Sequence, residues 1–265
     1  MRRYGLGSFL ALAAFLGWAT PARAQYGAQP NLPSAERFKV RVQYLWWTPQ
    51  IQGDLQKGAG GIEGTLLDVQ SDLGMGTGDT NQLSGAVRLG NSWKLRGSWS
   101  PIDFSGDTPA TQPFLYGTTL VQAGDQVATS IKGNAYGAGL EWDFTQGQTG
   151  FLGLTFGVKY FDVTSTLANA TTSSGVTERR QMPIPVVGLT GRVYFRKISL
   201  EADVSGMTLG SRGHVWDLLG TARFHLSDGF AAVGGYRKLI LQGSDNPDYF
   251  HLDLGTWTYG AEISL

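Results

Sequence analysis

The sequence has no cysteine among its 265 residues, so disulfide bonds cannot hold the fold together. Only three histidines are present, and their scattered positions lack the spacing of a metal site. Walker loops, nucleophile elbows and zinc motifs are also missing. The glycine-rich stretches 58–61 and 74–78 lie in a long loop without a following helix, so they do not indicate phosphate binding. We therefore expect neither a metal nor a cofactor.

Long apolar runs are missing beyond residue 24, which excludes transmembrane helices of about 20 residues. The first residues have a different character. Arg2 and Arg3 precede a short apolar run at residues 6–18, and residues 21–24 (Pro-Ala-Arg-Ala) form an Ala-x-Ala cleavage signal. This arrangement is typical of a secretory signal peptide. We expect residues 1–24 to be removed and the mature chain, 25–265, to be exported.

Neither sign of charge is in excess, because 21 basic residues stand against 21 acidic ones. Three of the arginines lie in the expected signal peptide, which leaves 18 basic residues in the mature chain. A slightly acidic chain of this kind does not indicate a nucleic-acid partner.

Glycine and aromatic residues are abundant, with 38 Gly, eight Trp and 12% aromatic residues overall. Each glycine inside a helix costs about 1 kcal/mol relative to alanine, so long helices are disfavoured. Transmembrane β-barrels combine many aromatic residues at the two water interfaces with alternating strands. The composition therefore favours a β-barrel.

Strict alternation of apolar and polar residues marks the strands. The clearest case is Ile198, Leu200, Ala202 and Val204, which alternate with polar and acidic residues. We predict an all-β, antiparallel, up-and-down transmembrane barrel over residues 37–265, preceded by a periplasmic segment at 25–36. Ten strands are expected, at residues 37–48, 81–89, 93–103, 128–144, 150–162, 181–195, 198–206, 214–226, 230–242 and 249–265. Extra hairpins within 49–68 or at 114–121 would give twelve strands, and eight is the other alternative.

The expected connections alternate between short and long. Tight turns at 90–92, 145–149, 196–197 and 227–229 alternate with polar segments at about 48–80, 104–127, 162–180, 207–213 and 243–249. Short periplasmic turns and long outer loops are typical of bacterial outer-membrane barrels. Seven prolines fall in or beside the long loops, where a residue without an N–H harms a sheet least.

Aromatic residues near the strand ends decide which face of the barrel is outside. They form two expected girdles, made by Trp93, Trp142, Phe195 and Phe224 near the periplasmic ends and by Trp46, Trp99, Tyr160 and Trp216 near the outer ends. Girdles of this kind contact lipid at both membrane interfaces. We therefore predict a Gram-negative outer-membrane location, with lipids as partners and a monomeric state.

The chain ends on an alternating apolar strand, like the C-terminal signal that the barrel assembly machinery binds. The usual last residue of that signal is Phe, whereas this chain ends with Leu265. The assembly machinery is therefore the second expected partner.

Two short stretches resemble a group of uncharacterised proteobacterial outer-membrane barrels, small and porin-like or OmpA-like. They are residues 43–46 (Gln-Tyr-Leu-Trp) with 49–53 (Pro-Gln-Ile-Gln-Gly), and residues 235–237 (Gly-Tyr-Arg) with the terminal strand 255–265. The resemblance covers only the two ends of the barrel. It implies the fold and no particular activity.

The polar faces of the strands should line the lumen. The two-residue turn at 196–197 makes Phe195 face Ile198 and Arg192 face Glu201, and the turn at 90–92 brings Arg88 opposite Lys94. That like-charged pair needs a counter-charge, for which Glu262 and Glu141 are candidates. The residues expected in the lumen are Lys39, Arg41, Arg88, Lys94, Arg96, Glu141, Arg192, Glu201, Asp203, Asp217, Arg223, His225 and Glu262.

This set predicts a basic periplasmic half of the lumen. Such a half could be an anion-attracting vestibule or a packed network of ion pairs. We favour the packed network, because small barrels leave room for little beyond side chains.

A catalytic site has only one weak candidate, His251 and Asp253 on one face of the last strand. Omptin-family barrel proteases carry Asp-x-His with a separate acidic pair, whereas the order here is His-x-Asp and no such pair is evident. We therefore expect no enzyme. A structural or surface-display barrel comes first, a narrow channel for anions or small solutes second, and a membrane-embedded hydrolase third.

Overall fold

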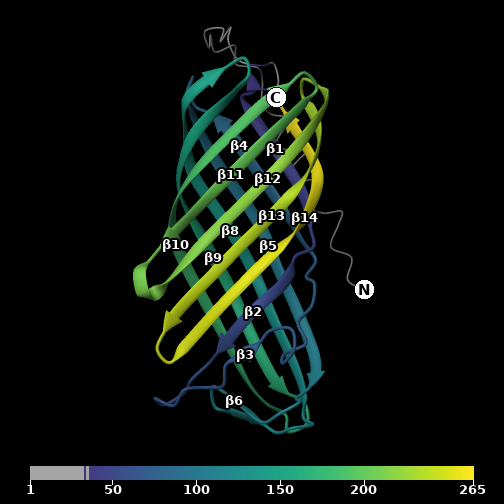
Figure 1. Cartoon of the computed structure of the whole chain (residues 1–265), viewed down its shortest axis with the longest axis vertical. Helices are drawn as coiled ribbons and strands as arrows, with labels where there is room; N and C mark the ends of the chain where they lie inside the picture. The colour runs from purple at the N-terminus through teal and green to yellow at the C-terminus, as the bar shows by residue number, and fades with distance from the viewer. Residues whose placement is uncertain (1–32, 34–35) are drawn as a thin grey trace, which may run out of the picture. The chain divides into compact units, whose positions relative to one another are not determined.

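The computed structural model describes residue 33 and residues 36–265 (Figure 1). The expected signal peptide and most of the segment 25–36 lie outside the described residues. No helix within the described residues is long and apolar enough to cross a membrane.

Ten antiparallel strands form a closed barrel, which confirms the predicted fold class and strand number. Each strand pairs with the next along the wall, and the last strand pairs back with the first. The wall consists of β1 (Val40–Trp47), β4 (Thr80–Arg88), β5 (Trp93–Pro109), β8 (Gln126–Gly147), β9 (Gly150–Asn169), β10 (Ser174–Phe195), β11 (Ile198–Thr208), β12 (Gly213–Ser227), β13 (Phe230–Asp245) and β14 (Asp248–Ser264).

Four shorter strands lie outside this count. β2 (Gln50–Gln56) continues β1 along β14 in an unbroken register, since Trp47 faces Thr258 and Gln50 faces Gly255. β3 (Leu67–Asp68) pairs with β2, and β6 (Phe114–Tyr116) pairs with β7 (Thr119–Val121). The two regions that could have added hairpins to the barrel, 49–68 and 114–121, thus form short strand pairs outside the ten-stranded wall.

The tight turns set the register that the sequence predicts. Phe195 faces Ile198 and Arg192 faces Glu201 across the turn at 196–197. Across the turn at 90–92, Arg88 faces Lys94. Arg196 has a φ of 53°, the left-handed conformation that a two-residue hairpin turn requires.

Several strands are longer than expected. Residues 162–180, predicted as a loop, extend β9 and β10 and leave a turn of only four residues between them. The prediction was wrong because outer ends that stand in water need no apolar face, so the alternating signal disappears while the pairing continues. For the same reason Pro109, expected in a loop, lies at the end of β5. Pro101, Pro183 and Pro185 lie within β5 and β10, as the predicted strands 93–103 and 181–195 imply.

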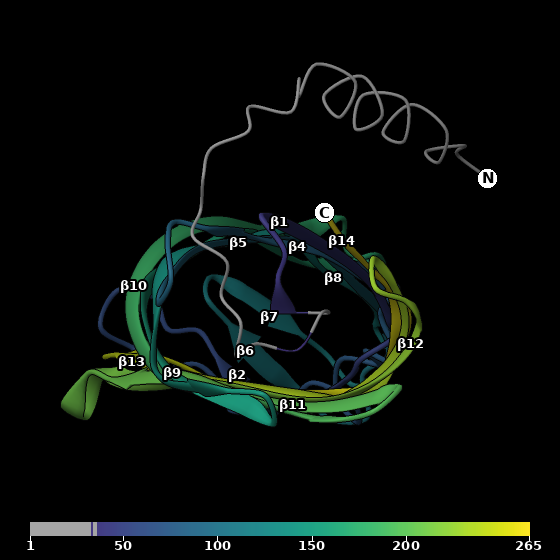
Figure 2. The ribbon, with the colours of Figure 1, turned by 90° about the horizontal axis from the view of Figure 1, so that it is seen from above.

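Burial in the barrel is the reverse of that in a water-soluble protein. Apolar side chains on the outer face are exposed, as for Phe195 at 59% and Leu200 at 47%, whereas Lys94 and Arg192 are buried inside. The view along the barrel shows the strands enclosing the lumen (Figure 2). An apolar outer face around a charged interior indicates a membrane barrel.

The expected girdle residues lie on the outer face. Tyr160 is half-buried and the other seven, Trp46, Trp93, Trp99, Trp142, Phe195, Trp216 and Phe224, are exposed there. Trp93 and Trp142 are register partners with stacked rings, 6.2 Å between centroids.

Candidate functional site in the barrel lumen

The half of the lumen at the end of the tight turns, predicted to be the periplasmic half, contains a network of ion pairs. Among the described residues, six cations (Arg41, Arg88, Lys94, Arg96, Arg192 and Arg223) meet six carboxylates (Glu36, Glu141, Asp143, Glu201, Asp203 and Glu262). The predicted basic half is thus balanced in charge. The expected set of lumen residues did not include Glu36 and Asp143. These two carboxylates account for much of the difference between the predicted excess of cations and the balance in the structure.

Glu36 supplies the counter-charge that the like-charged pair of Arg88 and Lys94 needs. Its Oε1 atom lies 2.8 Å from both Nη2 of Arg88 and Nζ of Lys94, and its Oε2 atom lies 3.4 Å from Nη1 of Arg41. Tyr194 donates its hydroxyl proton to the same carboxylate. Glu36 is 1% exposed, although the sequence assigned it to the segment before the barrel.

The electrostatic environment of Glu36 favours its ionised form. Burial raises the pKa of this carboxyl, but the surrounding cations, Lys94 foremost, lower the pKa to about 2. The carboxylate therefore carries a full negative charge at neutral pH.

Lys94 also contacts the two acidic residues of β8. Its Nζ atom lies 2.7 Å from Glu141 and 2.9 Å from Asp143, and it stands 3.7 Å over the ring of Phe151. Of the two counter-charges that the sequence suggested, Glu141 is in place.

Glu262 forms a second centre with β10 and β12. It lies 2.7 Å from Nε of Arg223 and 3.4 Å from Nη1 of Arg192. Glu201 also pairs with both of these arginines. The four side chains come from β10, β11, β12 and β14, so the cluster ties this side of the wall together from within the lumen.

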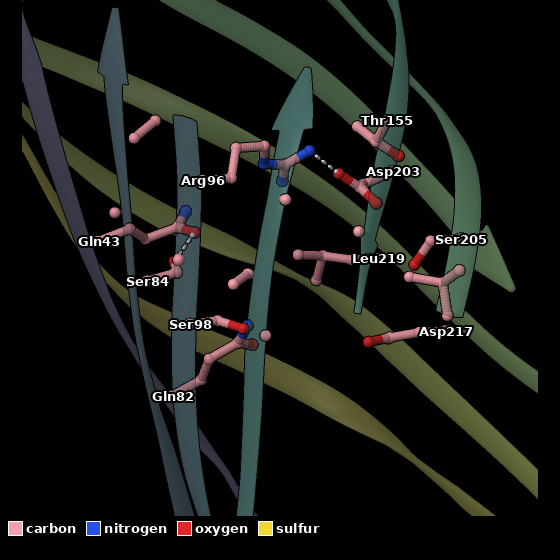
Figure 3. A pocket seen from close by; sticks show the side chains of 18 of the residues that line it. Gln43, Gln82, Ser84, Arg96, Ser98, Thr155, Asp203, Ser205, Asp217 and Leu219 are labelled. Carbon is pink, nitrogen blue, oxygen red and sulfur yellow. Dashed lines mark hydrogen bonds and ion pairs between the residues drawn. The ribbon is translucent and has the colours of Figure 1, made fainter. Parts of the chain in front are cut away.

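Arg192 links the two centres, because its Nη1 atom lies 3.9 Å from Oε2 of Glu36. Arg96 extends the network to Asp203 of β11. Its Nη1 atom lies 2.6 Å from Asp203 and 3.2 Å from Glu141, and Figure 3 shows it reaching toward Asp203 from the opposite wall. A small cavity of about 150 Å³ lies beside this pair, with polar side chains such as Gln43 and Ser84 along it (Figure 3).

Two expected lumen residues lie at the margin of the network. Lys39 is exposed, because β1 begins only at Val40. His225 is half-buried and lies 2.9 Å from the hydroxyl of Ser199.

A second charged layer lies near the middle of the lumen. Asp217 accepts hydrogen bonds from both Arg237 and Lys159. The guanidinium of Arg237 also stands 4.5 Å over the ring of Trp47, which is buried inside the barrel. Lys159 and Arg237 were outside the expected set.

On the outer side of this layer the lumen is lined mainly by apolar instead of charged side chains. A cavity of about 720 Å³ occupies the outer half of the barrel, and we call it the outer cavity. Its lining is mainly apolar, and its walls include Trp47, Ile51, Phe104, Ile131, Phe161, Ile184, Val215, Leu239 and Leu254. The sequence does not reveal it, because the alternation assigns the apolar face of every strand to lipid, whereas Ile51, Phe104 and Ile131 alternate with polar neighbours and face inward.

Two loop segments lie at the outer end, and we call them the cap, residues 57–78 and 110–125. Backbone hydrogen bonds join them, from Gly117 to Lys57 and from Thr65 to Leu115. The cap has its own buried apolar residues, Leu67, Val69, Leu73, Met75, Ala110, Phe114 and Val121.

Ion pairs tie the cap to the barrel wall, and we call them the outer ion-pair cluster. Lys57 lies 2.6 Å from Asp248 and 2.9 Å from Glu178. Arg180 contacts the same two carboxylates, at 2.6 Å and 2.8 Å. The cluster thus joins β10, β14 and the cap.

The weak catalytic candidates do not come together as a site. Asp253 pairs with Lys238 at 2.8 Å, and His251 is half-buried between the β2 and β13 strands that flank β14. Neither residue lines the outer cavity. Among the described residues, no group of three or more His, Cys, Asp or Glu side chains could hold a metal ion.

No protein-family model matches this sequence, and no curated protein matches it either. Solved structures do match. The outer membrane protease OmpT from Escherichia coli is 10% identical, with a TM-score of 0.56, over 85% of this chain and 96% of that one. The translocator domain of the autotransporter NalP from Neisseria meningitidis is 14% identical, with a TM-score of 0.44, over 97% and 98%.

At these identities the likeness to OmpT establishes a shared fold alone. The two end motifs that resemble a barrel group are not matched by any family model.

Proposed function

We propose that this protein is a non-conducting outer-membrane barrel that binds a small, neutral, apolar molecule in its outer cavity. The main support for the proposal is the size and the apolar lining of this cavity. Its volume of about 720 Å³ lies within the range of known small-molecule sites, and such sites are mostly apolar with few polar groups. Burial of apolar surface there contributes about 25 cal/mol per Å².

The charges at the ends of the cavity favour a neutral ligand. Lys57 and Arg180 already have carboxylate partners at the outer end, and Asp217 already has two cations at the inner end. An ionic ligand would have to compete with these internal partners.

The ion-pair network supports the packed lumen that the sequence favoured over a narrow anion channel. Balanced, buried charges give an anion no net attraction. We expect no discrete steps from refolded protein in a planar bilayer, and reproducible anion-selective steps would contradict this part. A hydrolase has less support, because Asp253 is engaged by Lys238 and is not available to orient His251.

The long outer ends of β9 and β10 support a place at the cell surface. Both strands continue past Tyr160 and Pro183 into polar segments paired over their whole length. We therefore retain surface exposure as part of the proposed role.

Binding can be tested with N-phenyl-1-naphthylamine, whose fluorescence rises in apolar sites. The barrel is placed in lipid nanodiscs, with empty nanodiscs as the baseline. We expect saturable binding of one molecule per barrel. Ala135→Trp puts a large side chain into the outer cavity and should weaken binding by about ten-fold or more.

Ala138→Trp is the matched control, because Ala138 lies on the same strand but is exposed on its outer face. This variant should bind the probe as the unmodified protein does. Fluorescence that never saturates, or equal binding by both variants, would overturn the proposal.

A further inference from the structure

The wall of the barrel has unequal height beside β10. On one side β10 pairs with β9 from Ser174 to Val193. On the other side it pairs with β11 only from Val187 to Phe195. The β11–β12 hairpin turns back at residues 209–212, and Figure 1 shows this turn (light green) ending short of the neighbouring strands. Within the described chain, residues 174–186 of β10 therefore form a ladder with β9 alone.

Two prolines lie on this open stretch. Pro183 and Pro185 are two positions apart, so both present the same edge of the strand. Proline cannot donate a hydrogen bond and is confined in sheets to edges that need no donor. The sequence thus keeps this edge from pairing with another strand.

β5 also extends beyond its neighbour β4, but there the cap lies against the free edge of the strand. The β4–β5 ladder ends at Leu83 and Trp99, but β5 continues for ten residues. There the cap supplies bridges, from Met75 to Gly106 and from Thr77 to Gln50. The open stretch of β10 has no corresponding bridge among the described residues.

We call the opening beside β10 the window. The hairpin turn at 209–212 bounds it on the periplasmic side, and the outer ion-pair cluster bounds it on the outer side. Met182 and Ile184 of β10 line the outer cavity at this edge, and so does Leu209 of the hairpin turn. Leu209 is also 45% exposed, so it borders both the cavity and the surroundings of the barrel.

The window lies at the level of the outer aromatic girdle. Pro183 is the register partner of Tyr160, and Trp216 faces Gly206 near the end of the hairpin. Girdle residues mark the interface between the membrane and water. The window therefore opens at the interface between the outer leaflet and water, while the cap lies at the end of the barrel.

We propose that the apolar ligand passes between the outer leaflet and the outer cavity through this window. The inference rests on the proposed binding function and specifies its ligand as a molecule that partitions into the membrane. Apolar molecules concentrate in the lipid, so a lateral path avoids their transfer through water.

A cross-link across the window tests this route. The chain has no cysteine, so Pro183→Cys with Leu209→Cys provides a unique pair. A reducible bis-maleimide is chosen from a series of spacer lengths, and mass spectrometry verifies the product. N-phenyl-1-naphthylamine is then delivered from preloaded phosphatidylcholine vesicles to the barrel in nanodiscs, and the rate of binding is followed by stopped-flow fluorescence.

The cross-link should slow binding by about ten-fold or more relative to the same double-cysteine variant before cross-linking. Reduction should restore the rate. The control pair, Asp103→Cys with Lys132→Cys, joins directly facing residues on the closed β5–β8 wall, and its cross-link should not change the rate. Each single-cysteine variant, treated with the same reagent, controls for local modification.

The outcomes separate the two proposals. An unchanged rate with the window cross-linked and saturable binding intact would overturn the lateral route alone. Equal slowing by both cross-links would also overturn it, because the effect would then not belong to the window. If the unmodified barrel shows no saturable binding, the proposed function itself fails.

Discussion

Glu36 lies 2.8 Å from Lys94, although the two residues are 58 positions apart and only Lys94 belongs to the barrel wall. The contact brings a segment outside the expected barrel into the lumen. It also satisfies a pair of cations that the hairpin turn forces to face each other.

Removal of this carboxylate should destabilise the barrel. Glu36→Gln leaves Lys94 and Arg88 with fewer counter-charges in a buried site, and breaking a buried pair costs about 3–5 kcal/mol. Urea unfolding in lipid vesicles measures the loss. Asp103→Asn, in an exposed pair with Lys132, should cost only about 0–1 kcal/mol. Equal losses from the two variants would contradict the role of Glu36.

The same carboxylate should make stability depend on pH. The pKa of Glu36 is lowered from 4.5 to about 2 in the folded protein, so its contribution is complete above pH 4.5. That contribution, roughly 3 kcal/mol, is lost as the pH falls from 4.5 toward 2. The unfolding free energy should fall less steeply with decreasing pH in Glu36→Gln than in the unmodified protein. Parallel curves for the two proteins would show that Glu36 is not the source of the pH dependence.

Arg192 and Glu201 should be energetically coupled. Arg192→Ala leaves Glu201 and Glu262 with fewer cations and should cost about 3–5 kcal/mol. Adding Glu201→Ala should restore part of that loss, with a coupling of about 1–3 kcal/mol in a double-mutant cycle. Strict additivity of the two losses would show that the pair contributes nothing as a pair.

The lipid-facing surface can be tested with one substitution at two places. Leu189 is 50% exposed on the outer face of β10, and Leu120 is 56% exposed in the cap. Leu189→Arg should cost about 2–4 kcal/mol, as expected for a cation at mid-membrane. Leu120→Arg should change stability by no more than about 0.5 kcal/mol, as at most exposed sites in water. Unfolding curves in lipid vesicles measure the two losses of stability. Equal losses would contradict the assignment of Leu189 to the lipid-facing surface.

The sequence predicts most of the wall because lipid imposes one rule on every strand. An outward apolar residue at every second position fixes phase, and short turns then fix register, as at Phe195 and Ile198. The rule weakens where the membrane ends. Residues 162–180 therefore looked like a loop although they continue β9 and β10.

The interior is harder to predict than the wall. Glu36 lies before the first strand, so no alternation could assign it to the lumen. Trp47 and Leu239 face inward, but Trp46 and Ile240 beside them are also apolar, and the pattern does not distinguish the two faces. The balanced network and the outer cavity follow from which strands face each other across the lumen, which a single sequence does not specify.

The balance of charge in the periplasmic half constrains how related barrels can diverge. A lineage that loses Glu36 keeps three buried cations around a missing partner, so Arg41, Arg88 or Lys94 must change with it. These distant positions should covary among homologues. Positions in the wall of the outer cavity, such as Ile51 and Leu254, have no charged partner to match and can exchange one apolar residue for another. The two halves of one lumen should therefore evolve by different rules.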